Sequence, residues 1–508
     1  MSPPALSRRR FLALAGTAAA ACARWARPGR DPETLVLAVR ADVTGIFPNP
    51  PIVNEAFTTQ VNWNVFEGLV RLDRDLYLRP ALAESWSSSP DAATYVFSLR
   101  PGLRFSDGRP VSASDVAVSL LRGREGVYRD SLHSIGDARA LDPSHVEVRT
   151  RTAYLALVTR LPWGLVLPAD AWQRSPVPGI GTGPYRLASW DKDERILLEA
   201  NPHFRGPRPS FTRVVYRVMP DDEVRVNAVL NGDADAAESL PLAQAAGLAR
   251  DPRVRPLVRE GLRVIFLALR PHGEPFGDPR VREAVDLAID RAELIRRVLH
   301  GWGALVGQLV PAGIPGFNPG LKVPAPDRAR ARALLAEAGY GGGLDIDLYG
   351  PNNRYVSDVA VLAEVARQLG LVGIRARADA LDKAVFFPLA ASGRTRLHLM
   401  GWSSEAGDAG DALDALAHSK DGTGLGSEND VDLADGQLDG LIQSANQTFD
   451  GEERIARLKT AMARLAALKV YMPLYVQPES ALVSSHIEWD PAPSLAFVAA
   501  EMRRANGV

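Results

Sequence analysis

The chain has 508 residues, enough for two or three lobes that each bury a hydrophobic core. Its 59 lysine and arginine residues nearly balance 60 aspartate and glutamate residues, so the formal net charge is -1 at pH 7. This balance argues against a dedicated nucleic-acid binder, because such proteins usually carry a basic excess or a basic stripe.

The N-terminal residues read as an export signal rather than as part of the fold. Residues 7–12 spell SRRRFL, which matches the twin-arginine export pattern, and the apolar run up to residue 21 is too short to span a bilayer. We therefore assign residues 1–31 to a leader and tether. The prediction is export by the twin-arginine route to a periplasmic or extracytoplasmic location.

Cys22 is the only cysteine, so the chain cannot form an intramolecular disulfide. It follows three alanines, a pattern that resembles a lipoprotein cleavage site at which the thiol is acylated. Ala19 stands where such sites usually have leucine, so ordinary cleavage without a lipid remains the alternative. We expect lipidation of Cys22, which would attach the mature protein to a membrane.

The first third of the mature chain predicts short strands with a few helices. A strand at 35–40 and a helix ending near Gly68, with that glycine as the helix cap, open the first lobe. Ser112 stands three residues before Asp115 and predicts a helix start with a capping box. Further strands are predicted at 69–72, 94–100 and 145–150.

The segment 179–184 has alternating glycines, as a phosphate-binding loop has. Such a loop must open a helix, whereas residues 184–190 alternate as a strand does. We therefore reject a nucleotide site here. Gly181 and Gly183 are instead expected to allow close backbone packing.

The second half of the chain alternates helices and strands. Residues 264–269 form a continuous apolar run, typical of a fully buried strand, and mark the first crossing into a second lobe. The tail from about Glu479 is expected to cross back. Helices are predicted at 281–289, 290–300, 328–338, 358–369 and 452–468, and strands at 344–348, 374–378, 396–400 and 473–476, the pattern of an α/β sheet covered on both faces.

Longer motifs occur along the chain in a characteristic order. They are FEGLVRLD at 66–73, PALAESW at 80–86, FSLRPGLRFSDG at 97–108, GTGPYRL at 181–187, ANPHFRG at 200–206, VLNGDAD at 229–235, DPRVREAVDLAIDRAELIRRVLHG at 278–301 and ARALLAEAGY at 331–340. In kind and order these motifs resemble those of the family 5 extracellular solute-binding proteins, the oligopeptide- and dipeptide-binding receptors of bacterial ABC importers. The resemblance covers nearly the whole mature chain.

The resemblance implies an α/β, two-lobe periplasmic-binding-protein fold with a hinged cleft and an extra small domain. Lobe I would comprise residues 32–65, 181–268 and 479–508, the inserted domain residues 66–180, and lobe II residues 269–478. A peptide or other small solute would be captured in the cleft and passed unchanged to an ABC permease and its ATPase. The resemblance therefore implies a monomeric binding protein, not an enzyme, without cofactor or nucleic-acid partner.

The strongest candidate for solute binding is the segment 401–408. The resemblance matches Glu405 to an aspartate that pairs with the α-amino group of a bound peptide, while Ala406 replaces a tyrosine of the family pattern. A tryptophan face with nearby carboxylates, here Trp402 with Glu405 and Asp408, suits an amine-bearing or cationic solute. The alternative is that Trp402 is core and both acids are solvated loop charges.

Two further places are candidates for solute contacts. Asn62 and Trp63 lie at the end of the opening helix, where family members often touch the ligand, although burial of Trp63 is an equal alternative. Arg354 and Tyr355 follow a predicted strand that ends at Gly350, and ligands of open α/β sheets sit beyond the carboxyl ends of strands. Arg354 could hold a carboxylate or phosphate, with plain solvation as its alternative.

Three other function classes compete with a transport receptor. A hydrolase lacks support because the chain has no Gly-x-Ser-x-Gly elbow and its lone cysteine is assigned to export. A nickel or haem carrier of the same family is the metal alternative, but the eight histidines show no HxH, HxxH or HxxxH spacing and we predict no metal site. A sensory or adhesive lipoprotein that reuses the fold is the third.

Overall fold

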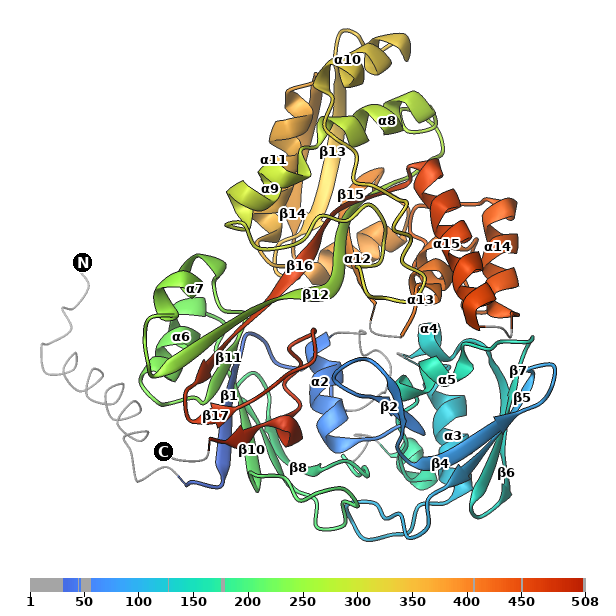
Figure 1. Ribbon diagram of the computed structural model, residues 1–508, viewed down its shortest axis with the longest axis vertical. Helices are drawn as coiled ribbons and strands as arrows, with labels where there is room; N and C mark the ends of the chain where they lie inside the picture. The colour runs from blue at the N-terminus through green and yellow to red at the C-terminus, as the bar shows by residue number, and fades with distance from the viewer. Residues whose placement is uncertain are drawn as a thin grey trace, which may run out of the picture.

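The computed structural model describes residues 31–43, 45–46, 56–126, 128–174, 179–404, 407–448 and 451–505. The predicted leader with Cys22 lies outside these ranges, and so do Glu405 and Ala406. Figure 1 shows one lobe above another, with two long strands running between them. None of the helices in the described ranges is long and apolar enough to cross a membrane. The names lobe I, inserted domain and lobe II are used below for the ranges predicted above.

A ten-stranded sheet runs through both lobes, with its strands in the order β14-β13-β15-β12-β16-β11-β1-β10-β9-β8. Its central strands, β12 (Val254–Leu269) and β16 (Tyr471–Ser484), are antiparallel and run from one lobe into the other (Figure 1). Their register shifts between Glu260 and Val264, which marks a bulge at the crossing. Both strands are longer than predicted, because each continues through the crossing into the sheet of the other lobe.

Lobe I contains β1 (Thr34–Val39), which is parallel to its neighbours β10 (Arg213–Val218) and β11 (Ala236–Glu238). The strands β9 (Arg195–Ala200) and β8 (Tyr185–Asp191) complete this end of the sheet. Its helices are α2 (Ala56–Val65), α6 (Asp222–Leu230) and α7 (Leu242–Leu248). The C-terminal tail adds β17 (Ile487–Glu488), the 3-10 helix η4 (Ala499–Glu501) and β18 (Arg503–Arg504).

The predicted helix cap at Gly68 is wrong, because α2 ends at Val65, three residues earlier. Gly68 instead allows close packing: a Cβ there would lie 2.4 Å from the carbonyl oxygen of Leu161. The predicted packing role of Gly181 is confirmed, since a Cβ on it would lie 2.0 Å from the carbonyl oxygen of Val65. A Cβ on Gly183 would lie 2.7 Å from the carbonyl carbon of Val65, so both glycines allow the chain to pack closely against the end of α2.

The inserted domain is built on a four-stranded antiparallel sheet in the order β4-β5-β7-β6. Its helix α3 (Ala113–Gly123) begins with the predicted capping box, in which Asp115 Oδ2 accepts a 2.9 Å hydrogen bond from the Ser112 backbone nitrogen. Its remaining elements are β2 (Val70–Leu72), β3 (Leu78–Pro80), β4 (Ala83–Ser88), β5 (Thr94–Leu99), α4 (Arg129–Leu132), β6 (Ile135–Asp142), β7 (His145–Thr150), α5 (Leu157–Arg160), η1 (Leu161–Trp163) and η2 (Ala169–Gln173). One hydrophobic cluster joins this domain to lobe I.

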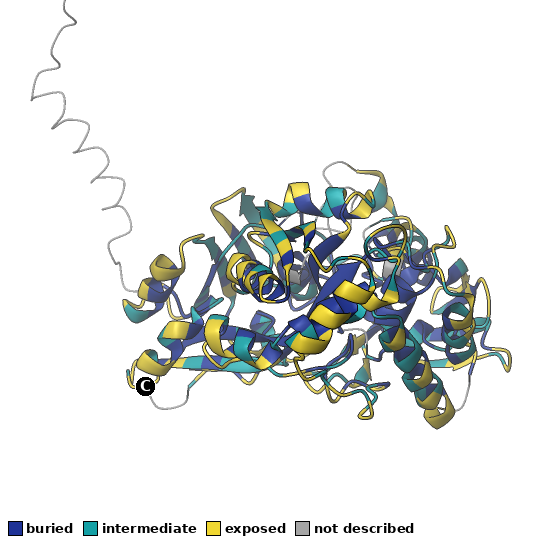
Figure 2. Ribbon diagram, turned by 90° about the horizontal axis from the view of Figure 1, so that it is seen from above, coloured by how far each residue is buried: buried dark blue, intermediate teal, exposed yellow. Residues whose placement is uncertain are grey.

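Lobe II places helices on both faces of β13 (Leu344–Pro351), β14 (Ile374–Leu381) and β15 (Leu397–Ser403), as Figure 1 shows. Alternate residues of β12 enter two different hydrophobic clusters, for example Leu267 in one and Phe266 in the other, which explains its continuous apolar run. In Figure 2 the buried residues follow the strands, while the outer helix faces are exposed. The helices are α8 (Pro279–Ala288), α9 (Arg291–Val298), α10 (Arg328–Glu337), α11 (Asp358–Gly370), α12 (Lys383–Ala391), α13 (Gly410–Ala412), the π-helix η3 (Leu413–Ala417), α14 (Gly436–Asn446) and α15 (Gly451–Leu468). Of these, α8, α9, α10, α11 and α15 were predicted from the sequence, whereas α12, α13 and η3 were not predicted.

Candidate functional site

Trp402 lies near the end of β15, directly opposite Val264 on the crossing strand β12. Its side chain is half-buried, and its indole nitrogen donates a 3.1 Å hydrogen bond to Oδ2 of Asp411. Trp402 is therefore neither a free surface side chain nor a fully enclosed core residue. It is held in place beside the strand that joins the lobes.

Arg354 and Tyr355 follow β13, as the sequence predicts, and the structure brings them close to the crossing strand. Tyr355 is buried, and burial raises the pKa of its hydroxyl. Two guanidinium groups flank its ring: the Cζ atom of Arg354 lies 5.7 Å from the ring centroid, and the Cζ atom of Arg263 lies 5.9 Å from it. Arg263 also donates a 3.4 Å hydrogen bond to the carbonyl oxygen of Gly401, next to Trp402.

A third arginine approaches the same place from lobe I. Asp358, at the start of α11, accepts hydrogen bonds from the backbone nitrogens of Arg354 (2.8 Å) and Tyr355 (3.0 Å). Burial raises the pKa of Asp358, and the positive charge of Arg40, just after β1, partly opposes this rise. Arg263, within β12, and Arg354, after β13, thus flank the Tyr355 ring, and Arg40, after β1, acts on the charge of Asp358 at the start of the following helix.

Sequence reasoning missed both Arg40 and Arg263. Across the described ranges, neither guanidinium has a carboxylate within ion-pair distance, whereas most other arginines near the sheet are paired. Arg40 follows an apolar strand run, and Arg263 interrupts one. An arginine is unusual at such positions, and this was the only local sequence signal for either residue. Their convergence depends on strand pairing, which the sequence pattern does not show.

Asn62 and Trp63 lie on α2 but point into different surroundings. Asn62 is buried, and its side-chain oxygen accepts no hydrogen bond from any of the described residues. Trp63 meets Trp163 edge to face, with ring centroids 6.2 Å apart, and lines a cavity of about 840 Å³. The cavity reaches Leu262 on the crossing strand, so it extends from the inserted domain to the hinge.

Glu67 lines this cavity, as do the acidic residues Asp73 and Glu501. Burial raises the pKa of the Glu67 carboxyl to about 7, although Arg71, Arg100 and Arg205 oppose the rise by their positive charge. The lining also contains apolar side chains, with Phe66 and Leu262 among them, and several arginines. The cavity is thus suited to an apolar body that carries negative charge at its edges.

Asp408 lies in a different environment from the one expected of a solute ligand. Its Oδ2 lies 2.5 Å from Nη1 of Arg454, and its Oδ1 accepts a 2.8 Å hydrogen bond from the Gly410 backbone nitrogen. Both side chains of the ion pair are buried. The structure therefore places Asp408 in a structural ion pair, apart from the arginines around Tyr355.

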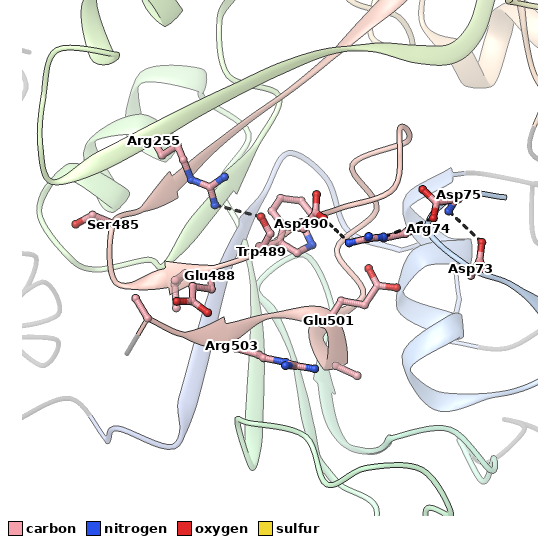
Figure 3. A pocket seen from close by; sticks show the side chains of 13 residues that line it. Asp73, Arg74, Asp75, Arg255, Ser485, Glu488, Trp489, Asp490, Glu501 and Arg503 are labelled. Carbon is pink, nitrogen blue, oxygen red and sulfur yellow. Dashed lines mark hydrogen bonds and ion pairs between the residues drawn. The ribbon is translucent and has the colours of Figure 1, made fainter. Parts of the chain in front are cut away.

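A second cavity, of about 960 Å³, lies between the turn after β2 and the C-terminal tail. Figure 3 shows Arg74 reaching across it toward Asp490, with Trp489 and Glu501 beside them. Its lining carries acidic and basic side chains together, and none of the residues predicted from the sequence lines it. Among the described residues, no cluster of three histidine, cysteine or acidic side chains is arranged to hold a metal ion.

Comparison with known proteins agrees with this architecture. The curated relatives include the glutathione-binding protein GsiB of Escherichia coli strain K12, which is 27% identical over 95% of this chain and 95% of its own length. Among solved structures, the agropinic-acid complex of AgaA from A. tumefaciens R10 has a TM-score of 0.83 at 24% identity, covering 94% of this chain and 99% of that one. A dipeptide-binding protein of Pseudoalteromonas sp. SM9913, in complex with Met-Leu, has a TM-score of 0.83 at 20% identity, covering 93% and 100%.

The sequence profile of the bacterial extracellular solute-binding proteins, family 5, matches residues 78–424. This match covers more than half of the chain, and the solved neighbours share the two-lobe fold of periplasmic binding proteins. The family consists of substrate receptors for transport. The chain belongs to the family 5 extracellular solute-binding proteins, and it is a solute receptor of the kind that serves an ABC importer.

Proposed function

We propose that this receptor captures a small solute that carries carboxylate groups and an amine, and delivers it unchanged to an ABC permease and its ATPase. The observation that carries the proposal is that the guanidinium groups of Arg263 and Arg354 flank the Tyr355 ring, with the charge of Arg40 acting on nearby Asp358. Guanidinium groups bind carboxylates through paired, charge-assisted hydrogen bonds. Arg40 and Arg263, which have no carboxylate within ion-pair distance among the described residues, favour an anion as their partner.

The amine would be held on the other side of the site. Trp402 offers an aromatic face beside Arg263, and Glu405 follows it by three residues in the chain. A cation over a tryptophan face, paired with a carboxylate, is a recurrent arrangement for ammonium groups. Asp408 is left out of this proposed site because its carboxylate is paired with Arg454. Asn62 is kept as a proposed contact because its buried side-chain oxygen accepts no hydrogen bond from the described residues.

Closure of the lobes explains how such a solute is selected. The arginines come from lobe I, the crossing strand and lobe II, so a carboxylate can contact all three only when the lobes approach each other. A ligand with contacts to both lobes shifts the population toward the closed state in proportion to its differential affinity. Metal or catalytic chemistry is not part of the proposal.

The relatives suggest the first probe. Glutathione, the solute in the name of GsiB, is a tripeptide with one amine and two carboxylates, which is the chemistry proposed here. We expect mass spectrometry of the exported protein to reveal a peptide-like or amino-acid-conjugate anion, and titration calorimetry to detect binding of reduced glutathione or of the compound found. A neutral or purely cationic solute would overturn the proposal.

Two arginines on the same strand allow a matched comparison. Arg263→Gln should weaken binding of the anion more than tenfold, because it removes a guanidinium that no described carboxylate neutralises. Arg259→Gln should leave affinity within twofold, because that side chain contacts the carbonyl oxygen of Pro491 (2.8 Å) and Asp490 (3.5 Å) instead. Equal affinities for wild type and Arg263→Gln would contradict the assignment.

We also propose a location for the protein in the cell. We infer export by the twin-arginine route from residues 7–12, and acylation of Cys22 from the alanines before it. An acyl anchor would keep the receptor near its permease. The residues concerned lie outside the described ranges, so the motif alone supports this part of the proposal.

A further inference from the structure

The inserted domain meets lobe II through a buried network that we call the interlobe clamp, formed by Tyr154, Arg160, Asp411 and Asp414. Arg160 is 1% exposed, and its Nη1 donates a 2.9 Å hydrogen bond to Oδ1 of Asp411. The hydroxyl of Tyr154 donates a 2.7 Å hydrogen bond to Oδ2 of Asp414. These contacts join the lobes at a place distinct from the crossing strands β12 and β16 (Figure 1).

The lobe II half of the clamp has an unusual backbone. Asp411 lies on α13, and Asp414 lies on the π-helix η3 that follows it directly. π-helical turns are rare and often occur at functional sites. Asn446 braces this segment, since its side chain donates a 2.7 Å hydrogen bond to Asp414 and its carbonyl accepts a 3.1 Å bond from the backbone of Leu155.

Asp411 connects the clamp to the proposed solute site. One of its oxygens accepts from Arg160, and the other accepts the 3.1 Å hydrogen bond from the indole nitrogen of Trp402. Burial raises the pKa of Asp411 to about 6, and the charge of Arg160 is the main influence that opposes this rise. Without Arg160, the carboxylate would lose both its partner and the charge that keeps it ionised.

We propose that Arg160 of the inserted domain is a positioning residue for solute binding, acting through Asp411 to fix the indole of Trp402 when the lobes close. The inference rests on the proposed function, in which Trp402 contacts the solute. Opening the lobes separates Arg160 from Asp411, so the tryptophan loses its fixed orientation. The inserted domain thereby takes part in recognition.

The closing reaction itself can be followed without any solute. Spin or fluorophore labels at Leu141→Cys and Val385→Cys, in a Cys22→Ser background, use exposed positions on the inserted domain and lobe II. The expected result is a shift of the distance distribution toward open forms in Asp411→Asn, and a larger shift in Arg160→Gln. Unchanged distributions in both variants would overturn the clamp, whatever solute the receptor binds.

Coupling to Trp402 is tested by a double-mutant cycle on solute affinity, with reduced glutathione or the co-purified compound as the probe. Asp411→Asn should weaken binding at least tenfold in the wild-type background and at least threefold less in a Trp402→Phe background, where the shift toward open forms persists but phenylalanine has no N–H to position. Equal losses in both backgrounds would show that Asp411 acts only on lobe closure or stability, and would overturn its positioning role.

Two further variants separate the clamp from ordinary interdomain packing. Arg129→Gln removes another contact between the inserted domain and lobe II, a 3.0 Å hydrogen bond to the Gly422 carbonyl, and should change solute affinity less than twofold. Arg160→Lys keeps the charge and should restore part of the closed population that Arg160→Gln loses. If no tested compound binds the wild type, the proposed function fails, but the distance measurements still decide on the clamp.

Discussion

The carboxylate of Asp408 lies 2.5 Å from the guanidinium of Arg454, and both side chains are buried. The pair ties the chain just before α13 to the long helix α15 and joins two residues that are 46 positions apart in the sequence. A carboxylate occupied in this way is poorly placed to receive an ammonium group from a solute. The chain just before α13 is therefore anchored to α15 by a structural ion pair.

Asp408→Asn should destabilise the protein, because it leaves the buried guanidinium of Arg454 without its counter-charge. Breaking one side of a buried ion pair costs about 3 kcal/mol or more. Urea denaturation measures this loss. Lost solute binding with unchanged stability would contradict the structural role and return Asp408 to the solute site.

Glu67→Gln tests the raised pKa of about 7 in the cavity between the inserted domain and the hinge. Because the pKa in the folded state exceeds that of the unfolded chain, the stabilisation is present at low pH and is lost as the pH rises through about 7. The glutamine variant should match the wild type at pH 5 and be more stable at pH 8, by on the order of 2 kcal/mol after allowance for partial exposure. Melting temperatures across this pH range provide the measurement, and parallel curves would refute the raised pKa.

Gly181→Ala should disrupt the close packing of the chain around residue 181 against the end of α2. The added Cβ would lie 2.0 Å from the backbone oxygen of Val65, which cannot withdraw without moving the helix end. We expect a loss of roughly 3 kcal/mol in unfolding free energy. Gly247→Ala is the matched control, since it lies in a helix with open space around its Cβ position and should stabilise by about 0.5–1 kcal/mol.

Glu405→Gln should weaken solute binding well over tenfold while leaving the melting temperature nearly unchanged. The substitution keeps the shape of the side chain but removes the charge that would pair with the solute's amine. Calorimetric titration with the co-purified solute gives the answer. Equal affinities for the two proteins would remove Glu405 from the proposed site.

Cys22→Ser should abolish acylation. The mature N-terminal peptide of the wild type is expected to be heavier by a diacylglycerol and a fatty acid, while the serine variant should lack this mass and leave the membrane fraction. Mass spectrometry of that peptide decides between lipidation and ordinary cleavage. An unmodified Cys22 in the wild type would favour the latter.

Local sequence was sufficient for most helices and strands. The capping box of Ser112 and Asp115, the apolar run of β12 and the helical spacing of α11 and α15 depend on residues within a few positions of one another. The exception at Gly68 shows the limit, because that glycine serves a contact with Leu161 rather than the helix beside it. Motif order identified the family for a similar reason, since each motif is short and continuous.

The chain by itself thus determined the two-lobe α/β fold, the receptor class and the positions of Trp402, Arg354 and Tyr355 at the ends of strands. Only the tertiary structure decided which charges meet. Arg454 neutralises Asp408. Arg263 and Arg354 meet at the Tyr355 ring, while the charge of Arg40 acts on Asp358. Arg160 contacts Asp411 across 251 positions of sequence. The physical reason is that strand register and the packing of the inserted domain on lobe II determine which hydrogen-bond and ion-pair partners meet. Neither of these produces a periodic pattern in the local sequence around the residues concerned.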